Sequence, residues 1–252
     1  MQSDSNSPSP SNIASTNSNS SPGRLLIPRS QRRKFFLQFT LMTILGWVVG
    51  GIISIALERI LLQSLPPEVF VQPTWGIWIR LLTSVVFAVV FGADQALALR
   101  HYLLPWLWML ATSAGWLIAT SVATAWIGYI SSIAASLNEA LSPELGIIFG
   151  FLSTILYIVS GIWLGLFQWL VLQRYTAGAW WWIFLPSLSF FFISILIWLL
   201  SVVQYLIPEV IRTAILYWSQ QGVTAIILGV IPAIGLCTLK RKSHRQTEVS
   251  GM

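Results

Sequence analysis

Long apolar stretches alternate with short polar segments along most of the chain. The apolar stretches run from Phe35 to Ala56, Trp78 to Leu99, Leu103 to Ile127, Leu145 to Leu172, Trp180 to Val203 and Ile215 to Leu239. A helix that rises about 1.5 Å per residue needs about 20 residues to cross about 30 Å of hydrocarbon, so each stretch is long enough to span a bilayer. None shows the strict alternation of a membrane strand, and helices pair every backbone group within one segment. The pattern predicts an all-α polytopic membrane protein with six transmembrane helices.

The composition supports this prediction. Of the 252 residues, 56% are hydrophobic and only 9% are charged, whereas about a quarter of the residues in soluble domains are charged. Residues 1–33 are rich in Ser, Asn and Pro and end in basic residues, so we expect a disordered tail that buries too little apolar surface to fold. Residues 34–240 then form the transmembrane domain, and residues 241–252 form a second basic tail.

The positive charges divide between the two sides of the membrane. The termini and the even-numbered connections carry Arg24, Arg29, Arg32, Arg33, Lys34, Arg100, Arg174, Lys240, Arg241, Lys242 and Arg245. The other connections carry Arg59, Arg80 and Arg212. Because Lys and Arg accumulate in cytoplasmic segments, we expect both termini to be cytoplasmic. The expected location is a bacterial inner (plasma) membrane.

Two signals repeat along the chain. The phrases "SLPPEV", "ALSPEL" and "YLIPEV" lie in the three outer connections. Basic joints lie before the first helix, at Arg33, and after the second, fourth and sixth, at Arg100, Arg174 and Arg241. The joints are 67, 74 and 67 residues apart, which fits two crossings and a loop. Every unit begins and ends on the same side, so the units are parallel repeats around an axis along the membrane normal. We predict three tandem helical hairpins, about 33–100, 100–174 and 174–241, in a pseudo-threefold bundle.

The repeated phrase has a structural and a functional interpretation. Proline suits the first helical position, and a carboxylate in the first turn faces the positive end of the helix dipole. Ser142, Pro143 and Glu144 therefore predict the start of the fourth helix, and the other two copies predict short interfacial helices before the second and sixth. Alternatively, an outer acidic ring gathers cations or a basic partner; its members are Glu68, Glu144 and Glu209.

A candidate polar site within the predicted spans consists of Asp94, Gln95 and Gln168. Intramembrane charge is costly, so Asp94 either reaches the headgroups or a joint arginine such as Arg174, or handles protons or ions. Both glutamines follow a glycine by three residues, Gly92 and Gly165, which places amide and glycine on one helix face. This spacing favours close helix contact with an interhelical amide hydrogen bond. A polar ligand site between the repeats is the alternative.

Other patterns concern helix packing and the membrane boundary. The small-xxx-small spacing of membrane helix contacts occurs at Gly46 and Gly50, Gly146 and Gly150, and Gly161 and Gly165. It does not distinguish packing within the chain from dimerisation. Tryptophans near the predicted inner ends are interpreted as interfacial anchors; they include Trp106, Trp108, Trp169 and Trp180 to Trp182.

The joints also supply a candidate inner basic ring, formed by Arg100, His101, Arg174 and Arg241. Beyond its role in topology, such a ring is suited to bind anionic lipid or a partner protein. The single cysteine, Cys237, excludes an intramolecular disulfide. Two histidines and one cysteine make no ligand set for zinc or haem, so we expect no metal and no cofactor.

The stretch from Gly165 to Trp182, "GLFQWLVLQRYTAGAWWW", resembles a motif of uncharacterised multi-pass membrane proteins common in cyanobacteria. That motif reads G-x-x-Q-W-L-x-L-R, a short turn and then Trp-Trp. Residues Gly92 to Trp108 are a weaker copy, in which Ala96 replaces the motif tryptophan. Gln173 precedes Arg174 in the better copy, and a third copy has lost the glutamine. The resemblance implies a multi-pass membrane protein, makes a thylakoid the alternative location, and implies no particular activity.

Three function classes follow from the sequence. Abundant packing signals and scarce intramembrane polar groups favour a non-enzymatic accessory, assembly or scaffold component, with membrane-protein partners or self-association in the lipid bilayer and no nucleic-acid partner. The alternative is a small transporter or channel with a path along the pseudo-threefold axis, lined by the candidate polar site. A membrane enzyme has the least support, because acid-base chemistry needs converging titratable groups.

Overall fold

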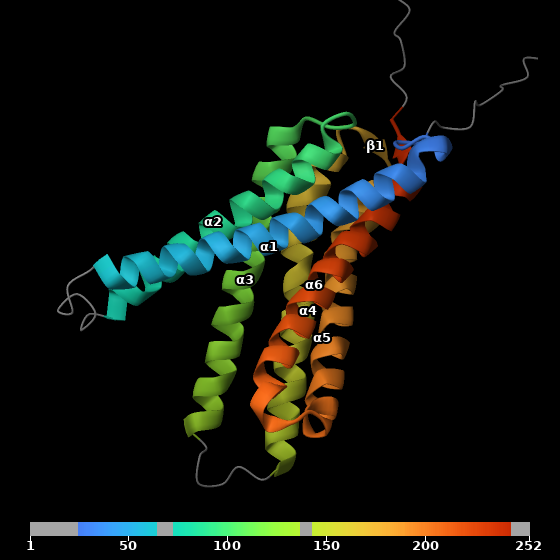
Figure 1. Cartoon of the computed structure of the whole chain (residues 1–252). Coiled ribbons are helices and arrows are strands. Elements are labelled where there is room, and N and C mark those ends of the chain that lie inside the picture. The colour runs from blue at the N-terminus through green and yellow to red at the C-terminus, as the bar shows by residue number, and fades with distance from the viewer. Residues whose placement is uncertain (1–24, 65–72, 137–142, 243–252) are drawn as a thin grey trace, which may run out of the picture.

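The computed structural model describes residues 25–64, 73–136 and 143–242 (Figure 1). Six helices in these ranges are long and apolar enough to cross a membrane, as predicted. They are α1 (Arg32–Ser64), α2 (Pro73–Leu99), α3 (Pro105–Ser136), α4 (Pro143–Leu172), α5 (Leu185–Val203) and α6 (Glu209–Thr238). Short 3-10 helices precede α1, α5 and α6; they are η1 (Arg29–Gln31), η3 (Ala179–Phe184) and η4 (Gln204–Leu206). The chain is an all-α polytopic membrane protein.

Proline marks most of the helix starts. Helices α2, α3 and α4 begin at a proline, and α6 begins at Glu209 directly after Pro208. Glu144 and Glu209 occupy the first turns of α4 and α6, where the helix dipole favours a carboxylate. The prediction of a separate interfacial helix before the sixth span was wrong, because Glu209 opens the spanning helix itself. The corresponding copy at Glu68 lies outside the described residues.

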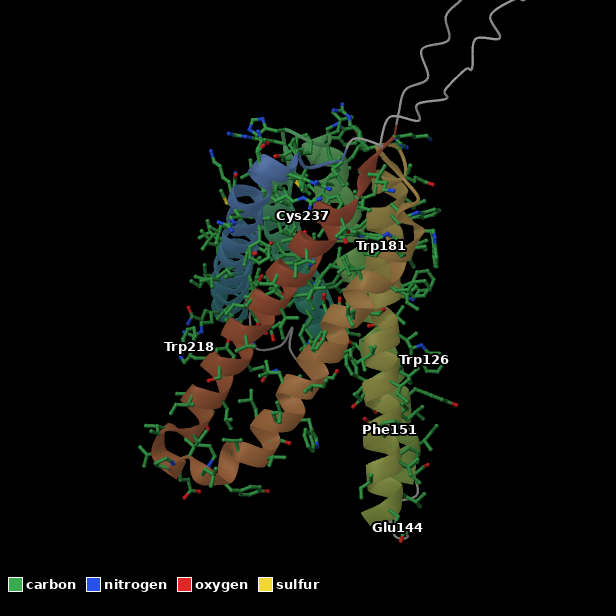
Figure 2. The ribbon with its side chains drawn as sticks, turned by 90° about the vertical axis from the view of Figure 1, so that its right-hand side faces the viewer. Trp126, Glu144, Phe151, Trp181, Trp218 and Cys237 are labelled. Atoms are coloured by element: carbon green, nitrogen blue, oxygen red, sulfur yellow. The ribbon has the colours of Figure 1, made fainter. Side chains whose placement is uncertain are left out.

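The helices form three antiparallel hairpins in a closed ring. Within the hairpins α1 packs on α2, α3 on α4 and α5 on α6; between them α2 packs on α3, α4 on α5 and α6 on α1. The hairpins converge where the two chain ends lie and diverge toward their opposite tips (Figures 1 and 2). We call the first end the basic end, since it carries Arg29 to Lys34, Arg100, Arg174 and Lys240 to Lys242. The opposite end, where α1, α3 and α5 end and α2, α4 and α6 begin, is the splayed end.

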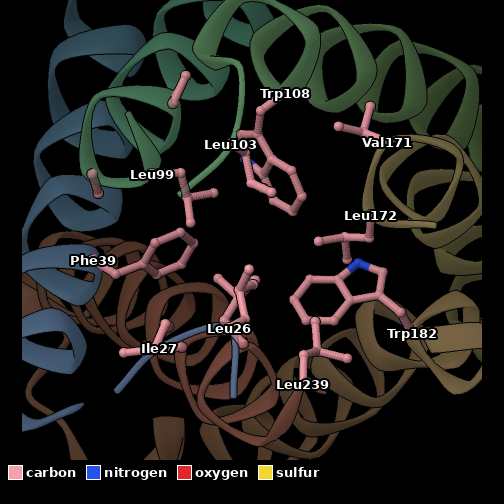
Figure 3. Packing of buried hydrophobic residues seen from close by; sticks show 14 of the residues in the cluster. Leu26, Ile27, Phe39, Leu99, Leu103, Trp108, Val171, Leu172, Trp182 and Leu239 are labelled. Atoms are coloured by element: carbon pink, nitrogen blue, oxygen red, sulfur yellow. The ribbon is translucent and has the colours of Figure 1, made fainter. Parts of the chain in front are cut away.

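The core lies mainly in the half of the bundle next to the basic end. One cluster there contains fully buried side chains from all three hairpins, seen in part in Figure 3; they include Phe39, Leu99, Trp108, Leu172, Trp182 and Leu236. A second cluster lies around Phe91, Phe190 and Leu228. Toward the splayed end burial is sparse: Ile79 on α2 and Ile130 on α3 are still buried. Within the described residues, however, α4 has no buried residue before Ser160 and α6 none before Thr224.

The first and last described segments of the chain are extended and pair at the basic end. A two-stranded antiparallel sheet pairs β1 (Thr176–Ala177) with β2 (Lys240–Arg241), and Leu25 bridges to Lys240. Next to them, Leu26 and Ile27 are buried in the main cluster (Figure 3). The predicted disordered tail therefore extended too far, because Leu26 and Ile27 are buried and helical structure begins at Arg29. The strands are two residues long, and so is the buried segment Leu26–Ile27. Such short segments have no hydrophobic periodicity from which to predict them.

Candidate functional site

The candidate glutamines bind buried tryptophans across helix interfaces. Gln168 Oε1 accepts a hydrogen bond of 3.0 Å from Trp182 Nε1, and Gln168 Nε2 donates to Thr112 Oγ1 at 3.2 Å. Gln95 Oε1 accepts from Trp108 Nε1 at 3.3 Å. All five side chains are buried. The predicted interhelical amide hydrogen bond is confirmed, and it pairs two groups that are costly to leave unpaired in lipid.

The interpretation of Trp108 and Trp182 as interfacial anchors was wrong. Both are 0% exposed, whereas Trp106 and Trp180 are 55% and 64% exposed. Neighbouring residues at a helix start point in different directions, so only some tryptophans of such a run face the boundary. Trp108 and Trp182 instead face the interior, where a glutamine amide accepts the indole hydrogen bond. The missed signal was the separation between Gln and Trp, 13 residues in one copy and 14 in the next.

A third amide–indole bond was not anticipated from the sequence. Trp47 Nε1 on α1 donates to Gln221 Oε1 on α6 at 2.9 Å. Each interface between hairpins therefore contains one such bond: α2 to α3, α4 to the segment entering α5, and α6 to α1. The bond between α6 and α1 lies closer to the splayed end than the other two, because Trp47 follows fully buried Phe39 by two helical turns.

Three glycines make equivalent contacts at these interfaces. A Cβ on Gly92 would lie 2.9 Å from the Met109 carbonyl oxygen, and one on Gly165 would overlap the backbone of Ile183. Met109 and Ile183 directly follow the buried tryptophans. A Cβ on Gly229 would lie 3.1 Å from Thr40 Cα, and Thr40 directly follows Phe39.

Beside Gly229, at the position equivalent to the other two polar pairs, this third interface has apolar residues instead. Phe39 takes the position of Trp108 and Trp182, and buried Pro232, three residues after Gly229, takes the position of the glutamines. Proline inside a helix leaves one carbonyl without its partner, which is tolerated where neighbouring helices surround it. The core near the basic end therefore has polar pairs at two of its three interfaces.

Asp94 does not converge with the two glutamines. Its side chain is half-buried against α1, where a Cβ on Gly46 would lie 2.8 Å from Asp94 Oδ2. Gln95, the next residue, faces α3 instead. Among the described residues Asp94 makes no ion pair, with Arg174 or any other base. The structure thus distributes the candidate polar site over three different contacts.

The glycine pairs fall into two groups. Cβ atoms on Gly46, Gly50, Gly161 or Gly165 would meet atoms of a neighbouring helix or its entry segment within 3.4 Å. These pairs serve packing within the chain. In contrast, Gly146 and Gly150 on the outer half of α4 have nothing within 4 Å of such a Cβ.

The charged candidates lie at the two ends. Glu144 and Glu209 are exposed at the tips of the second and third hairpins (Figure 2 labels Glu144). At the basic end, Arg100 Nε donates to His101 Nε2 at 3.2 Å, and both line a cavity of about 700 Å³ that also includes Lys34 and Gln38. Arg174 is exposed in the turn after α4.

A neighbouring cavity of about 510 Å³ is lined by His101, Tyr102 and Arg241. The Tyr102 hydroxyl donates to Gln31 Oε1 at 3.0 Å. Burial raises the pKa of Tyr102, and Cys237 adds to the increase, so the phenol keeps its proton for this bond. The structure therefore gathers Arg100, His101 and Arg241 around two adjoining cavities.

These features define a polytopic membrane protein whose buried glutamines Gln95 and Gln168 bind buried tryptophans. Within the described ranges, no group of three or more His, Cys, Asp or Glu side chains is placed to hold a metal ion. Comparisons with protein-family models, curated proteins and solved structures gave no match.

Proposed function

We propose that the protein is a non-enzymatic membrane component that works by associating with other membrane proteins or with a second copy. The observation that carries this proposal is the face of α4 formed by Gly146 and Gly150. It has the spacing of a helix contact, yet no neighbouring helix of the described chain comes within 4 Å of the place of either Cβ. Small residues let helix backbones approach closely, and close packing drives helix association in lipid.

The surroundings of this face support an association role. It lies on the part of α4 that extends beyond the core, where the hairpins have diverged (Figure 2). Ile147 and Phe151 beside it are 73% and 67% exposed. A partner helix that packs on the glycines would cover these side chains, and van der Waals contacts would replace contacts with lipid tails.

The interior gives less support to the alternative, a path along the pseudo-threefold axis. Near the basic end the space between the hairpins is filled by buried side chains that include Phe39, Trp108 and Trp182 (Figure 3). Gln95 and Gln168 are buried and bonded to indoles rather than turned toward water. A transport path needs polar groups that face an aqueous cavity.

The orientation is part of the proposal. Bases are gathered at the basic end, whereas the carboxylates of Glu144 and Glu209 lie at the tips of the splayed hairpins. Because Lys and Arg accumulate on the cytoplasmic side, the basic end faces the cytoplasm. The half of α4 with Gly146 and Gly150 then lies in the opposite leaflet.

The test is affinity purification of the tagged full chain from its native membranes in mild detergent, with mass spectrometry and size analysis. We expect a reproducible stoichiometric partner or a homo-oligomer, which Gly150→Leu disrupts without unfolding the protein. Gly128→Leu is the matched control, because Gly128 also has nothing within 4 Å of a Cβ and lies on α3. A wild-type monomer without partners would overturn the proposal, and so would equal loss of association in both variants.

A further inference from the structure

A cleft between α1 and α6 combines arginines with apolar walls. It is open on one side and has a volume of about 520 Å³ at the basic end. Arg32 and Arg33 from the first turn of α1 lie on it, and its apolar lining includes Phe36, Leu37, Ile234 and Cys237. We call it the α1–α6 cleft. It is separate from the cavities around His101 and from the glycine face on α4.

The arginines of this cleft lack acidic partners. Arg32 Nε is buried and has no hydrogen-bond partner among the described residues. The carboxylates in the described ranges belong to Glu58, Asp94, Glu144 and Glu209, and none of them lines the cleft. A buried N–H without an acceptor is costly, and a guanidinium offers a planar fork of donors that matches a phosphate group.

The walls indicate what accompanies the phosphate. Leu37 and Ile234 are 60% and 52% exposed on helices that cross the membrane, so the cleft opens onto the lipid-facing surface. Phe36 lies one turn deeper along α1 than Arg32. The arginines lie at the membrane boundary, and the apolar wall lies deeper in the membrane. This arrangement matches a phospholipid, with its phosphate at the arginines and an acyl chain along the wall. The cavity around Arg100 is lined instead by Gln31, Gln38 and Lys34, which suits polar groups only.

We infer that the α1–α6 cleft binds an anionic phospholipid, with Arg32 and Arg33 holding its phosphate and Leu37 and Ile234 contacting an acyl chain. This inference goes beyond the association function and does not depend on it. A lipid held there would touch the first helix and the last, which meet at this interface. Because a ligand that binds only the folded state stabilises it by mass action, bound lipid would raise the melting temperature.

The test uses the full chain in a neutral detergent, with native mass spectrometry to count bound lipid and a melting-temperature titration to measure affinity. Three probes separate the sources of phosphate: phosphatidylglycerol, phosphatidylcholine and soluble glycerol 3-phosphate. We expect stabilisation and retained lipid with phosphatidylglycerol only. Equal stabilisation by phosphatidylcholine would overturn the anionic specificity, and equal stabilisation by glycerol 3-phosphate would overturn the role of the acyl chain.

Two variants locate the site. The double variant Arg32→Gln and Arg33→Gln should weaken binding of phosphatidylglycerol about 30-fold, since each base near anionic lipid contributes roughly a factor of five. The control Arg174→Gln with Lys242→Gln removes the same charge from exposed positions at the same end and should leave affinity within about twofold of wild type. An equal loss in this control would overturn the assignment to the cleft.

The second variant, Ile234→Trp, keeps both arginines and fills the apolar part of the cleft. Ile234 is half-exposed, so the larger side chain does not enter the core. We expect it to fold and to lose retained phosphatidylglycerol, which provides a result even if the arginine variant fails to fold. Undiminished lipid binding in Ile234→Trp would overturn the proposal.

Discussion

Trp108 and Trp182 meet edge to face in the core, with ring centroids 6.1 Å apart and ring planes at 70°. Each indole N–H donates to a glutamine three residues after a glycine on the preceding helix. One contact thus joins equivalent positions of two consecutive hairpins. Edge-to-face packing adds to the burial of the two rings, and the amide acceptors satisfy donors that lipid would leave unpaired.

Of the three amide–indole bonds, the one at Gln168 should lower the free energy of unfolding most when its amide is removed. Gln168→Leu removes two hydrogen bonds and leaves the Trp182 indole N–H without an acceptor, so we expect a loss of about 1–2 kcal/mol in the free energy of unfolding. Reversible unfolding in mixed detergent measures it. Gln173→Leu is the control, because the exposed Gln173 amide bonds only to a carbonyl of its own helix. Equal effects would contradict a special role for Gln168.

The two types of glycine should respond oppositely to the same substitution. Gly165→Ala places a Cβ against the backbone of Ile183, and overpacking of this kind costs about 1–3 kcal/mol. Gly150→Ala meets nothing within 4 Å in the same helix and should be neutral or stabilise the helix by up to about 1 kcal/mol. Thermal unfolding of both variants compares them. A tolerated Gly165→Ala would show that α4 and η3 are not in close contact.

The segment before the first helix should contribute to stability. Ile27 is 0% exposed within the main cluster, so Ile27→Ala should cost about 2–4 kcal/mol, as for other large-to-small changes in a core. Pro28→Ala is the control at the next residue, which is exposed. Chemical unfolding gives both values. A cost below about 0.5 kcal/mol for Ile27→Ala is the range of surface changes and would indicate that the segment is not packed.

The candidate polar site should be closed to water. In a Cys237→Ser background, a cysteine at fully buried Thr112, beside Gln168, should react with a water-soluble maleimide at least about 100-fold more slowly than Arg174→Cys, because buried thiols are inert. Labelling of the intact protein in native membranes measures both rates. Comparable rates would reveal an aqueous cavity beside Gln168 and would favour the transporter alternative.

Much of the fold followed from the sequence because membrane spans need only length and apolarity. The six spans were recognised, but their ends were set by other residues: α1 continues to Ser64 and α3 to Ser136, through Ser, Glu and Arg that hydropathy alone excludes. The glycine-to-glutamine spacing also predicted the amide bonds, since both residues share one helix face. The indole partners of Gln95 and Gln168 were not predicted, because Trp108 and Trp182 come close to these amides only once the hairpins pack.

The sequence by itself determined the class of protein, the number of helices and the division of charge between the ends. Each of these depends on residues close together in the chain: apolar runs, prolines at helix starts and bases at the joints. Only the tertiary structure decided which glycines are packed, which tryptophans are buried, and that Gln221 binds Trp47. These contacts join different hairpins, so they depend on how much of its length each hairpin packs against the next. The hairpins are in contact near the basic end and diverge toward the splayed end.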